Sequence, residues 1–214
     1  FRAVGSTANC GDPMTVLNSI VAKQLKDFKM EVDKLIDEKG LKKDEAVFNV
    51  LREYIKASKN IRFEGDGYGD EWVKEAEKRG LSNIKDTPTA LDVRIAKDTV
   101  KMFEELNIFT AVELEARHEV ELENYILKLQ IEARVLGELS LNHIVPAAIK
   151  YQNELIKNVT GLKELGLSKD ATKSQMKLVE FIAKHINLIE QNVNDMVDAR
   201  KKANKIDDAS KKAK

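Results

Sequence analysis

The chain has 214 residues, enough for one large domain or two small ones with a buried core. Its 36 Lys and Arg balance its 36 Asp and Glu, and this zero net charge argues against a general binder of nucleic acid or anionic membranes. Charged residues make up 34% of the chain, aromatic residues only 6%, and there are three prolines, a composition that favours long, solvated helices.

Cys10 is the single cysteine, which excludes a disulfide within the chain and suits a reducing cytoplasm. No nearby histidine supports a nucleophilic role, so we expect an inert, buried or half-exposed thiol. No stretch approaches the roughly 20 apolar residues of a membrane span, and no signal peptide is visible. We therefore predict a cytoplasmic protein without a membrane partner.

The first third of the chain predicts a short non-helical opening followed by two helices. Residues 1–12 are small and polar, as in a strand end that runs into a loop. Asp12 and Pro13 fit the N-cap and first residue of a helix that Gly40 ends. A second helix is expected over residues 44–58, where apolar residues recur at helical spacing.

A glycine-rich stretch interrupts the helical pattern at residues 60–69. Gly65, Gly67 and Gly69 could cradle a phosphate, but the Lys-Ser/Thr pair of a P-loop is absent, so a turn into the next helix is favoured. Gly80 fits the end of that short helix. The run 86–88 (Asp-Thr-Pro) then opens a segment that is helical, with a possible break, to about residue 106.

From Thr110 onward the pattern becomes that of long helices. Thr110 and Glu113 form a capping box, and helical spacing continues to about residue 165, with Pro146 expected to kink or split the helix. A turn over residues 161–168 and a last helix from about residue 170 predict an antiparallel hairpin with a frayed, solvated end beyond Arg200. The stripe expected to face the partner helix comprises Ile126, Leu129, Ala133, Leu136, Leu139 and His143.

Five stretches of this chain resemble glutamine synthetases. Residues 1–9 read FRAVGSTAN, which is similar to the arginine-bearing strand and the Ala-Asn loop of that family's catalytic domain. Gly65-Asp66-Gly67-Tyr68 resembles a later Gly-Asp-x-aromatic turn. The runs VELEARHE (112–119), QIEARVLG (130–137) and LNHIVPAAI (141–149) resemble the long helical C-terminal region of type III glutamine synthetases.

This resemblance implies an ATP-dependent ligase that phosphorylates glutamate and then joins ammonia to it. Such chemistry uses ATP and two Mg²⁺ or Mn²⁺ ions around a charge-rich transition state. Arg2 would be the family's active-site arginine, binding a carboxylate or phosphoryl oxygen; the alternative is that it is simply an exposed terminus. The metal ligands and the ATP-binding residues would precede this chain, so no cofactor or metal site is assigned within it.

The expected fold is mainly α. Residues 1–86 would be the remnant of the α+β catalytic domain, and residues 87–214 an all-α extension built on a long-helix hairpin. The resemblance implies a chain truncated at both ends, inactive by itself, from an enzyme that assembles as a homo-oligomer of stacked rings.

Two other hypotheses stay open. The helices after Thr110 could be an interaction module without catalysis of its own. Alternatively, Glu115 and His118 have the E-x-x-H spacing of di-metal helical bundles, although no second such pair exists. His143 is expected to hydrogen-bond a carbonyl freed by Pro146, and His185 to pack within the bundle.

Overall fold

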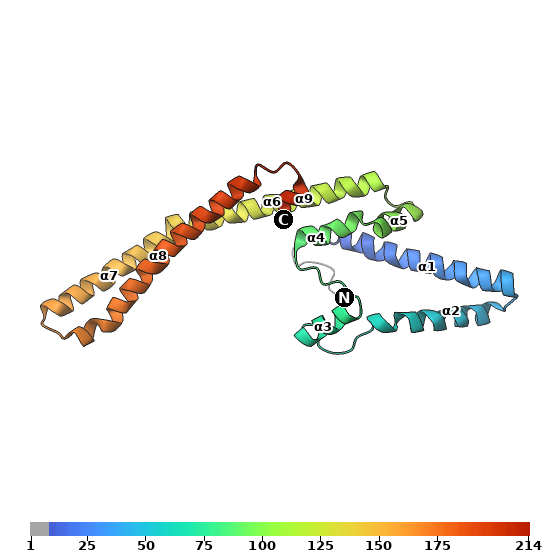
Figure 1. Ribbon diagram of the computed structural model, residues 1–214, viewed down its shortest axis with the longest axis horizontal. Helices are drawn as coiled ribbons and strands as arrows, with labels where there is room; N and C mark the ends of the chain where they lie inside the picture. Colours follow the sequence, from blue (N-terminus) through green and yellow to red (C-terminus); the bar gives the residue numbers. More distant parts are fainter. Residues whose placement is uncertain (1–8) are drawn as a thin grey trace. The chain divides into compact units, whose positions relative to one another are not determined.

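The structure is a computed structural model that describes residues 9–214 (Figure 1). Helices dominate it, and no strand occurs in this range, so the prediction of a mainly α fold is confirmed. The chain divides into two compact units between His118 and Glu119, inside helix α6 (Ala111–Leu139). We describe each unit by itself. The predicted domain boundary at residues 86 and 87 stays a prediction, as does the α+β remnant; its strand end was expected within residues 1–12, of which residues 9–12 contain no strand and residues 1–8 lie outside the described range.

The first unit begins with a helical hairpin of α1 (Gly11–Lys39) and α2 (Lys43–Ala57). Gly40 ends α1 in the left-handed region, with φ of 64°, as its position in the sequence predicted. Val32, Ala46 and Val50 form the buried core between the two helices. The predicted second helix is confirmed to within one residue at each end.

The start of α1 differs from the prediction. The helix begins at Gly11, and Asp12 lies in its first turn instead of serving as the N-cap. The Asn9 side chain explains the earlier start, because its Oδ1 accepts a hydrogen bond from the Gly11 N–H at 2.8 Å. Asp12 is thereby left available for a contact elsewhere in the unit.

Short helices complete the first unit. They are the 3₁₀ turn η1 (Ser58–Ile61), α3 (Asp70–Lys78), α4 (Thr87–Asp92), the 3₁₀ turn η2 (Val93–Ile95) and α5 (Lys97–Glu105). Asp86 caps α4 by accepting a hydrogen bond from the Thr89 N–H at 2.9 Å. The expected break is real, because Ala96 adopts an extended conformation between η2 and α5.

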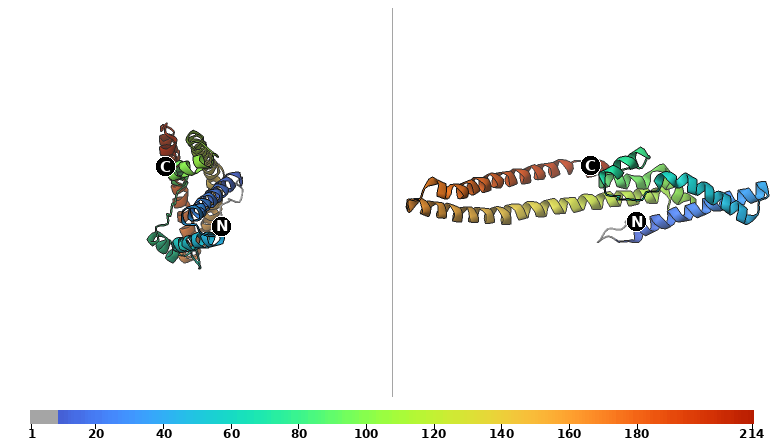
Figure 2. Two further views of the ribbon diagram at one scale, coloured as in Figure 1. Left: turned by 90° about the vertical axis from the view of Figure 1, so that its right-hand side faces the viewer. Right: turned by 90° about the horizontal axis from the view of Figure 1, so that it is seen from below.

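The second unit is a long antiparallel hairpin. One arm is the remainder of α6 followed by a π-helical turn, η3 (Ser140–Ile144), and α7 (Val145–Glu164). Helix α8 (Lys169–Ala203) returns beside this arm, as the right-hand view in Figure 2 shows. Gln152 Nε2 donates to the Val179 carbonyl at 3.0 Å across the two helices. The predicted hairpin is confirmed, although its turn covers residues 165–168, because α7 continues through Gly161.

Gly137 of α6 lies against side chains of α8. A Cβ added at Gly137 would lie 3.4 Å from Val193 Cγ1 and 3.5 Å from Met196 Cε, so the absent side chain lets the helices approach. Ser140 is also buried. The predicted stripe is therefore wrong in part, since Leu129, Leu136 and Leu139 are exposed.

The end of the chain is also more ordered than predicted. After α8 the chain turns and forms a short helix, α9 (Ala209–Ala213), whose N-cap Asp208 accepts a hydrogen bond from the Lys211 N–H at 2.8 Å. Gln130 of α6 donates to Asn204 at 2.8 Å just past the end of α8.

Candidate functional site

Arg2, the predicted active-site residue, lies outside the described residues, so the structure first shows this region at the start of α1. There the Asp12 carboxylate is paired with the guanidinium of Arg94 in η2. The Arg94 side chain is only 12% exposed, whereas that of Asp12 is 45% exposed. The first turn of α1 is thus tied to a residue 82 positions later in the chain.

A second polar contact holds α1 further along its length. Lys23 Nζ lies 2.6 Å from Asp27 and 3.2 Å from a carboxylate oxygen of Glu105, at the end of α5. These hydrogen bonds, first that to Asp27, raise the pKa of Lys23 above its usual range. Lys26 Nζ also donates to the Glu105 backbone carbonyl at 2.9 Å. Charged and polar groups therefore fasten α1 to α5.

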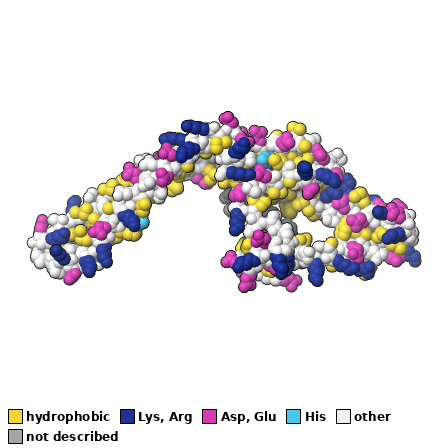
Figure 3. Space-filling model, in the orientation of Figure 1, with side chains coloured by type: hydrophobic (Ala, Val, Ile, Leu, Met, Phe, Trp, Pro, Cys, Tyr) yellow, Lys and Arg dark blue, Asp and Glu magenta, His cyan; other side chains and the backbone are white. Residues whose placement is uncertain are grey.

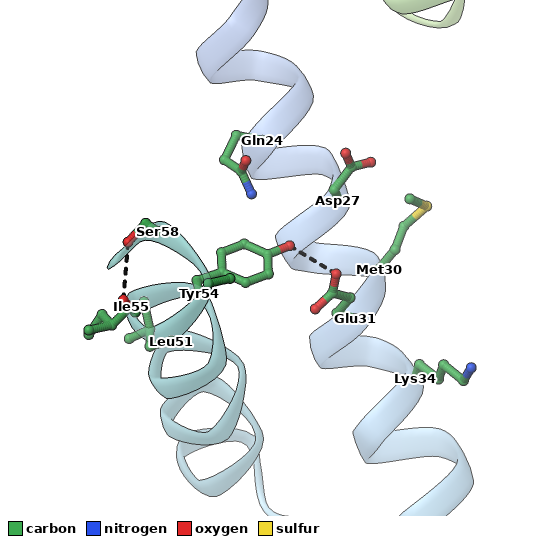
Figure 4. A pocket seen from close by; sticks show the side chains of 10 residues that line it. Gln24, Asp27, Met30, Glu31, Lys34, Leu51, Tyr54, Ile55 and Ser58 are labelled. Atoms are coloured by element: carbon green, nitrogen blue, oxygen red, sulfur yellow. Dashed lines mark hydrogen bonds between the residues drawn. The ribbon is translucent and has the colours of Figure 1, made fainter. Parts of the chain in front are cut away.

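An open groove of about 760 Å³ lies between α1 and α2 (Figure 4). Its lining combines apolar side chains, including Met30 and Leu51, with Tyr54, whose hydroxyl donates to Glu31 at 3.0 Å. Burial, followed by this hydrogen bond to Glu31, raises the pKa of the Tyr54 hydroxyl. The groove carries neither a nucleophile–base pair nor a cluster of cations.

The glycine-rich loop forms the predicted turn. Asp66 accepts hydrogen bonds from the Tyr68 N–H at 2.9 Å and, through its carbonyl, from the Gly69 N–H at 3.4 Å, so these donors are already used within the loop. Beside it Trp72 stacks on Phe63 with ring centroids 3.8 Å apart, and Arg79 lies over the same indole. The Arg79 guanidinium also donates to the Arg62 carbonyl at 3.0 Å. This packing serves to fix the loop.

The three histidines have separate environments. His118 is 8% exposed, and its Nε2 donates to Oδ1 of Asp92 at 3.0 Å, fastening α6 to the end of α4. His143 is exposed, and the predicted hydrogen bond from its ring to a carbonyl freed by Pro146 is not seen. The π-helical turn η3, just before Pro146, accommodates the N–H that proline lacks. His185 is exposed as well, with its ring 4.2 Å from that of Phe181.

None of these histidines belongs to a metal-binding cluster. Over residues 9–214, no group of three or more His, Cys, Asp and Glu side chains is placed to hold a metal ion. In the E-x-x-H motif, His118 uses its ring nitrogen for Asp92, as described above. Cys10, the lone thiol, is exposed at the start of α1.

The second unit carries an exposed apolar ridge, formed by Leu127, Ile131, Val135 and Leu139 at successive intervals of four residues along α6. Their exposed fractions are 54%, 51%, 48% and 47%, and they lie on a different face of the helix from buried Leu122 and Gly137. Apolar side chains are also visible over the α7–α8 arm in Figure 3. A helix that is apolar on two faces normally packs against two partners.

Comparison with known proteins identifies the family. Residues 46–163 match the model of the glutamine synthetase C-terminal domain. The chain belongs to the glutamine synthetase C-terminal domain family. It is 45% identical, over its whole length, to a glutamine synthetase of Bacteroides fragilis, and 30% identical over 94% of its length to a type-3 glutamine synthetase of Dictyostelium discoideum. The resemblance found in the sequence is therefore confirmed.

The matched relatives are much longer than this glutamine synthetase C-terminal domain chain. It spans 30% of the Bacteroides fragilis protein, 27% of the Dictyostelium discoideum protein, and 21% of a glutamine synthetase of Butyrivibrio fibrisolvens to which it is 33% identical. The family match covers the hairpin α1–α2 only in part, and ends in α7. Across residues 9–214, no helix is long and apolar enough to cross a bilayer.

Sequence reasoning did not single out Arg94, Glu105 or Asp92. Each is one charged residue in a chain that is one-third charged, and its partner lies far away in sequence. Asp12 was recognised, but as a cap, because its position before a proline fits that local role equally well. No local spacing signal could have found these pairs.

Proposed function

We propose that this chain is the C-terminal part of an ATP-dependent glutamate–ammonia ligase, that is, of a glutamine synthetase. The whole-chain identity of 45% to the Bacteroides fragilis glutamine synthetase carries the proposal. In this reaction the side-chain carboxylate of glutamate attacks the γ-phosphorus of ATP and ADP leaves. Ammonia then displaces inorganic phosphate from the acyl phosphate to give glutamine.

Arg2 is the residue of this chain to which we assign a direct role. Its planar guanidinium would bind a carboxylate or phosphoryl oxygen in the catalytic pocket, where a fixed cation offsets the negative charge that builds up in the transition state. Residues 1–86 would then be the end of an α+β catalytic domain. The expected cofactors are ATP and Mg²⁺ or Mn²⁺, and we assign none of their ligands to residues 9–214. A cytoplasmic location remains an expectation from the lone cysteine.

The test is ammonia-dependent phosphate release by the assembled parent enzyme with glutamate, ATP and Mg²⁺. Arg2→Ala should lower kcat by about 10²–10³-fold, the usual effect of removing one donor to a developing negative charge. Arg52→Ala, which removes an exposed arginine on α2, is the matched control and should leave turnover unchanged. Near-normal turnover of Arg2→Ala would refute the role, and the 214-residue chain alone should release no phosphate.

A second function is favoured by the apolar ridge of α6. We infer that the helices after Thr110 also join neighbouring subunits of the parent enzyme, consistent with its expected assembly as stacked rings. The half-exposed Leu127, Ile131, Val135 and Leu139 would be buried in that contact, since exposed apolar patches of this kind mark interaction sites.

Light scattering of the parent enzyme tests this assembly role. The double variant Leu127→Lys/Ile131→Lys should reduce particle size, because two charges cannot be buried in an apolar contact without a large desolvation cost. The control Gln191→Lys/Asn194→Lys adds the same charge at exposed polar positions of α8 and should keep the original size. Deletion of the residues after Thr110 should likewise change assembly before chemistry. An unchanged particle size of Leu127→Lys/Ile131→Lys would exclude the ridge as a subunit contact.

A further inference from the structure

We propose that a cavity between α6, α8 and α9 binds a small carboxylic acid with an apolar tail. The cavity has a volume of about 240 Å³ and lies at the end of α8 that is remote from the turn joining α7 to α8 (Figure 1). This volume is below the roughly 300–1,000 Å³ of pockets that take drug-sized molecules, so the ligand is small. None of the four ridge residues lines the cavity, which is therefore distinct from the surface assigned to subunit assembly.

Apolar side chains form most of the cavity wall. Ile126, Leu129 and Ala133 come from one face of α6, at intervals of three and four residues. Ala199 and Ala203, one turn apart on α8, leave the space between the helices open. Leu129 is 43% exposed, so an apolar ligand group in the cavity would remove its side chain from water. The wall thus suits a hydrocarbon group.

Two half-buried cations line the same cavity, Arg200 of α8 and Lys212 of α9. Among residues 9–214 neither side chain is in an ion pair or a hydrogen bond, and no carboxylate lines the cavity. The neighbouring Lys201, by contrast, pairs with Asp198 at 3.4 Å. Cations that are partly removed from water without a counter-charge favour an anion, and a guanidinium can hold a carboxylate through two parallel hydrogen bonds. An anionic head group beside an apolar tail therefore complements this lining.

Hydrogen bonds hold the wall that α9 contributes. Gln130 of α6, which also lines the cavity, donates to Asn204 just past the end of α8 at 2.8 Å. At the start of α9, Asp208 accepts a hydrogen bond from the Lys211 N–H at 2.8 Å. These contacts fix the turn that brings Lys212 to the cavity. A site formed in advance loses little conformational freedom when its ligand binds.

A neighbouring cavity between α6 and α8 is less suited to an anion. It also has a volume of about 240 Å³, and Ala133 and Arg200 line both cavities. Its wall includes Glu138, whose negative charge would repel a carboxylate. The cavity that includes Lys212 is therefore the one to which we assign the ligand.

Isothermal titration calorimetry of the parent enzyme with sodium octanoate tests this site. Octanoate should bind, whereas acetate, which has no long tail, and 1-octanol, which has no charge, should bind at least tenfold more weakly. Hexanoate should bind about tenfold more weakly than octanoate, because two buried methylene groups are lost.

Two variants locate the binding. Arg200→Gln/Lys212→Gln removes both charges while keeping similar helix propensity, and should weaken octanoate binding at least tenfold. Its matched control, Lys201→Gln/Lys211→Gln, removes the same charge from exposed neighbours outside the cavity and should leave the affinity unchanged. Ala203→Leu fills the cavity but keeps both cations. It should also weaken binding at least tenfold, and it decides the matter if the charge variant fails to fold.

Equal affinity of the parent enzyme and Arg200→Gln/Lys212→Gln for octanoate would overturn the assignment, as would similar losses in this variant and its control. Absence of octanoate binding by the parent enzyme would overturn it too, since another segment or subunit would then cover the cavity. Because no turnover is measured, these results do not depend on the role assigned to Arg2.

Discussion

At the scale of single residues, a local motif at the N-terminus of α6 shifts the pKa of Glu113. Thr110 Oγ1 accepts from the Glu113 N–H at 3.3 Å, and Glu113 Oε2 accepts from the Thr110 N–H at 2.8 Å, which is the reciprocal arrangement of a capping box. The backbone hydrogen bond from Thr110, followed by that from its hydroxyl, lowers the pKa of Glu113 below its usual value. The ionised carboxylate is therefore favoured in the folded state.

Because the folded-state pKa of Glu113 is lowered, its contribution to stability is present above the unfolded pKa of about 4.3 and is lost as the pH falls through the folded value. Between pH 7 and pH 3, the free energy of unfolding of Glu113→Gln should therefore fall by less than that of the parent sequence. Urea unfolding followed by circular dichroism at several pH values measures this. Glu115→Gln, an exposed neighbour on α6, is the control; equal pH dependence of Glu113→Gln and the parent sequence would contradict the assignment.

At the scale of elements, the contact between α6 and α8 depends on side-chain size. Gly137 faces Val193 and Met196 at distances that leave room for one methyl group and no more. A glycine inside a helix normally lowers stability by about 1 kcal/mol relative to alanine, so its position here reflects the close approach of α8. The nearby π-turn at Ser140–Ile144 accommodates Pro146 without ending the arm.

Two substitutions at Gly137 should distinguish the effect of helix propensity on stability from that of packing against α8. Gly137→Ala should stabilise the hairpin by up to about 1 kcal/mol, whereas Gly137→Leu should destabilise it by about 1–3 kcal/mol through overpacking against α8. Gly161 in α7 is the control, because nothing lies within 4 Å of an added Cβ there, and both substitutions should be tolerated. Chemical unfolding followed by circular dichroism gives the comparison. Similar stability of the two Gly137 variants would show that the helices do not approach closely there.

At the scale of the whole molecule, each of the two units buries only a few apolar side chains. The buried hydrophobic residues divide into Val32, Ala46, Val50, Phe103 and Leu114 before residue 119, and Leu122, Val159 and Val193 after it. Compact units of one chain can unfold in separate transitions. Trp72, the single tryptophan of the chain, lies in the first unit and reports on it alone.

We therefore expect unfolding in urea to give different midpoints by Trp72 fluorescence and by circular dichroism at 222 nm, which follows the helices of both units. Val193→Ala, which truncates a buried side chain between α6 and α8, should shift only the circular dichroism transition. Superimposable transitions that move together in the variant would instead mean a single cooperative unit.

Most of the helical architecture was predictable from the sequence because its signals are local. Gly40, the Asp86 cap, the Thr110–Glu113 box and the helical apolar spacing each act within about one or two turns, so the residues that make each bond are near neighbours in the chain. The sequence by itself also determined the family, through the motifs of residues 112–149, which the comparisons confirmed.

The tertiary structure decided which partners meet across long separations. It paired Asp12 with Arg94 and Asp92 with His118, and it buried the Gly137 face of α6 while exposing the leucines expected to be inside. Helical periodicity identifies the faces of a helix but not the one that a returning segment covers. Likewise, one charge among many has no sequence signature for its partner, because that choice is made only when the chain folds back on itself.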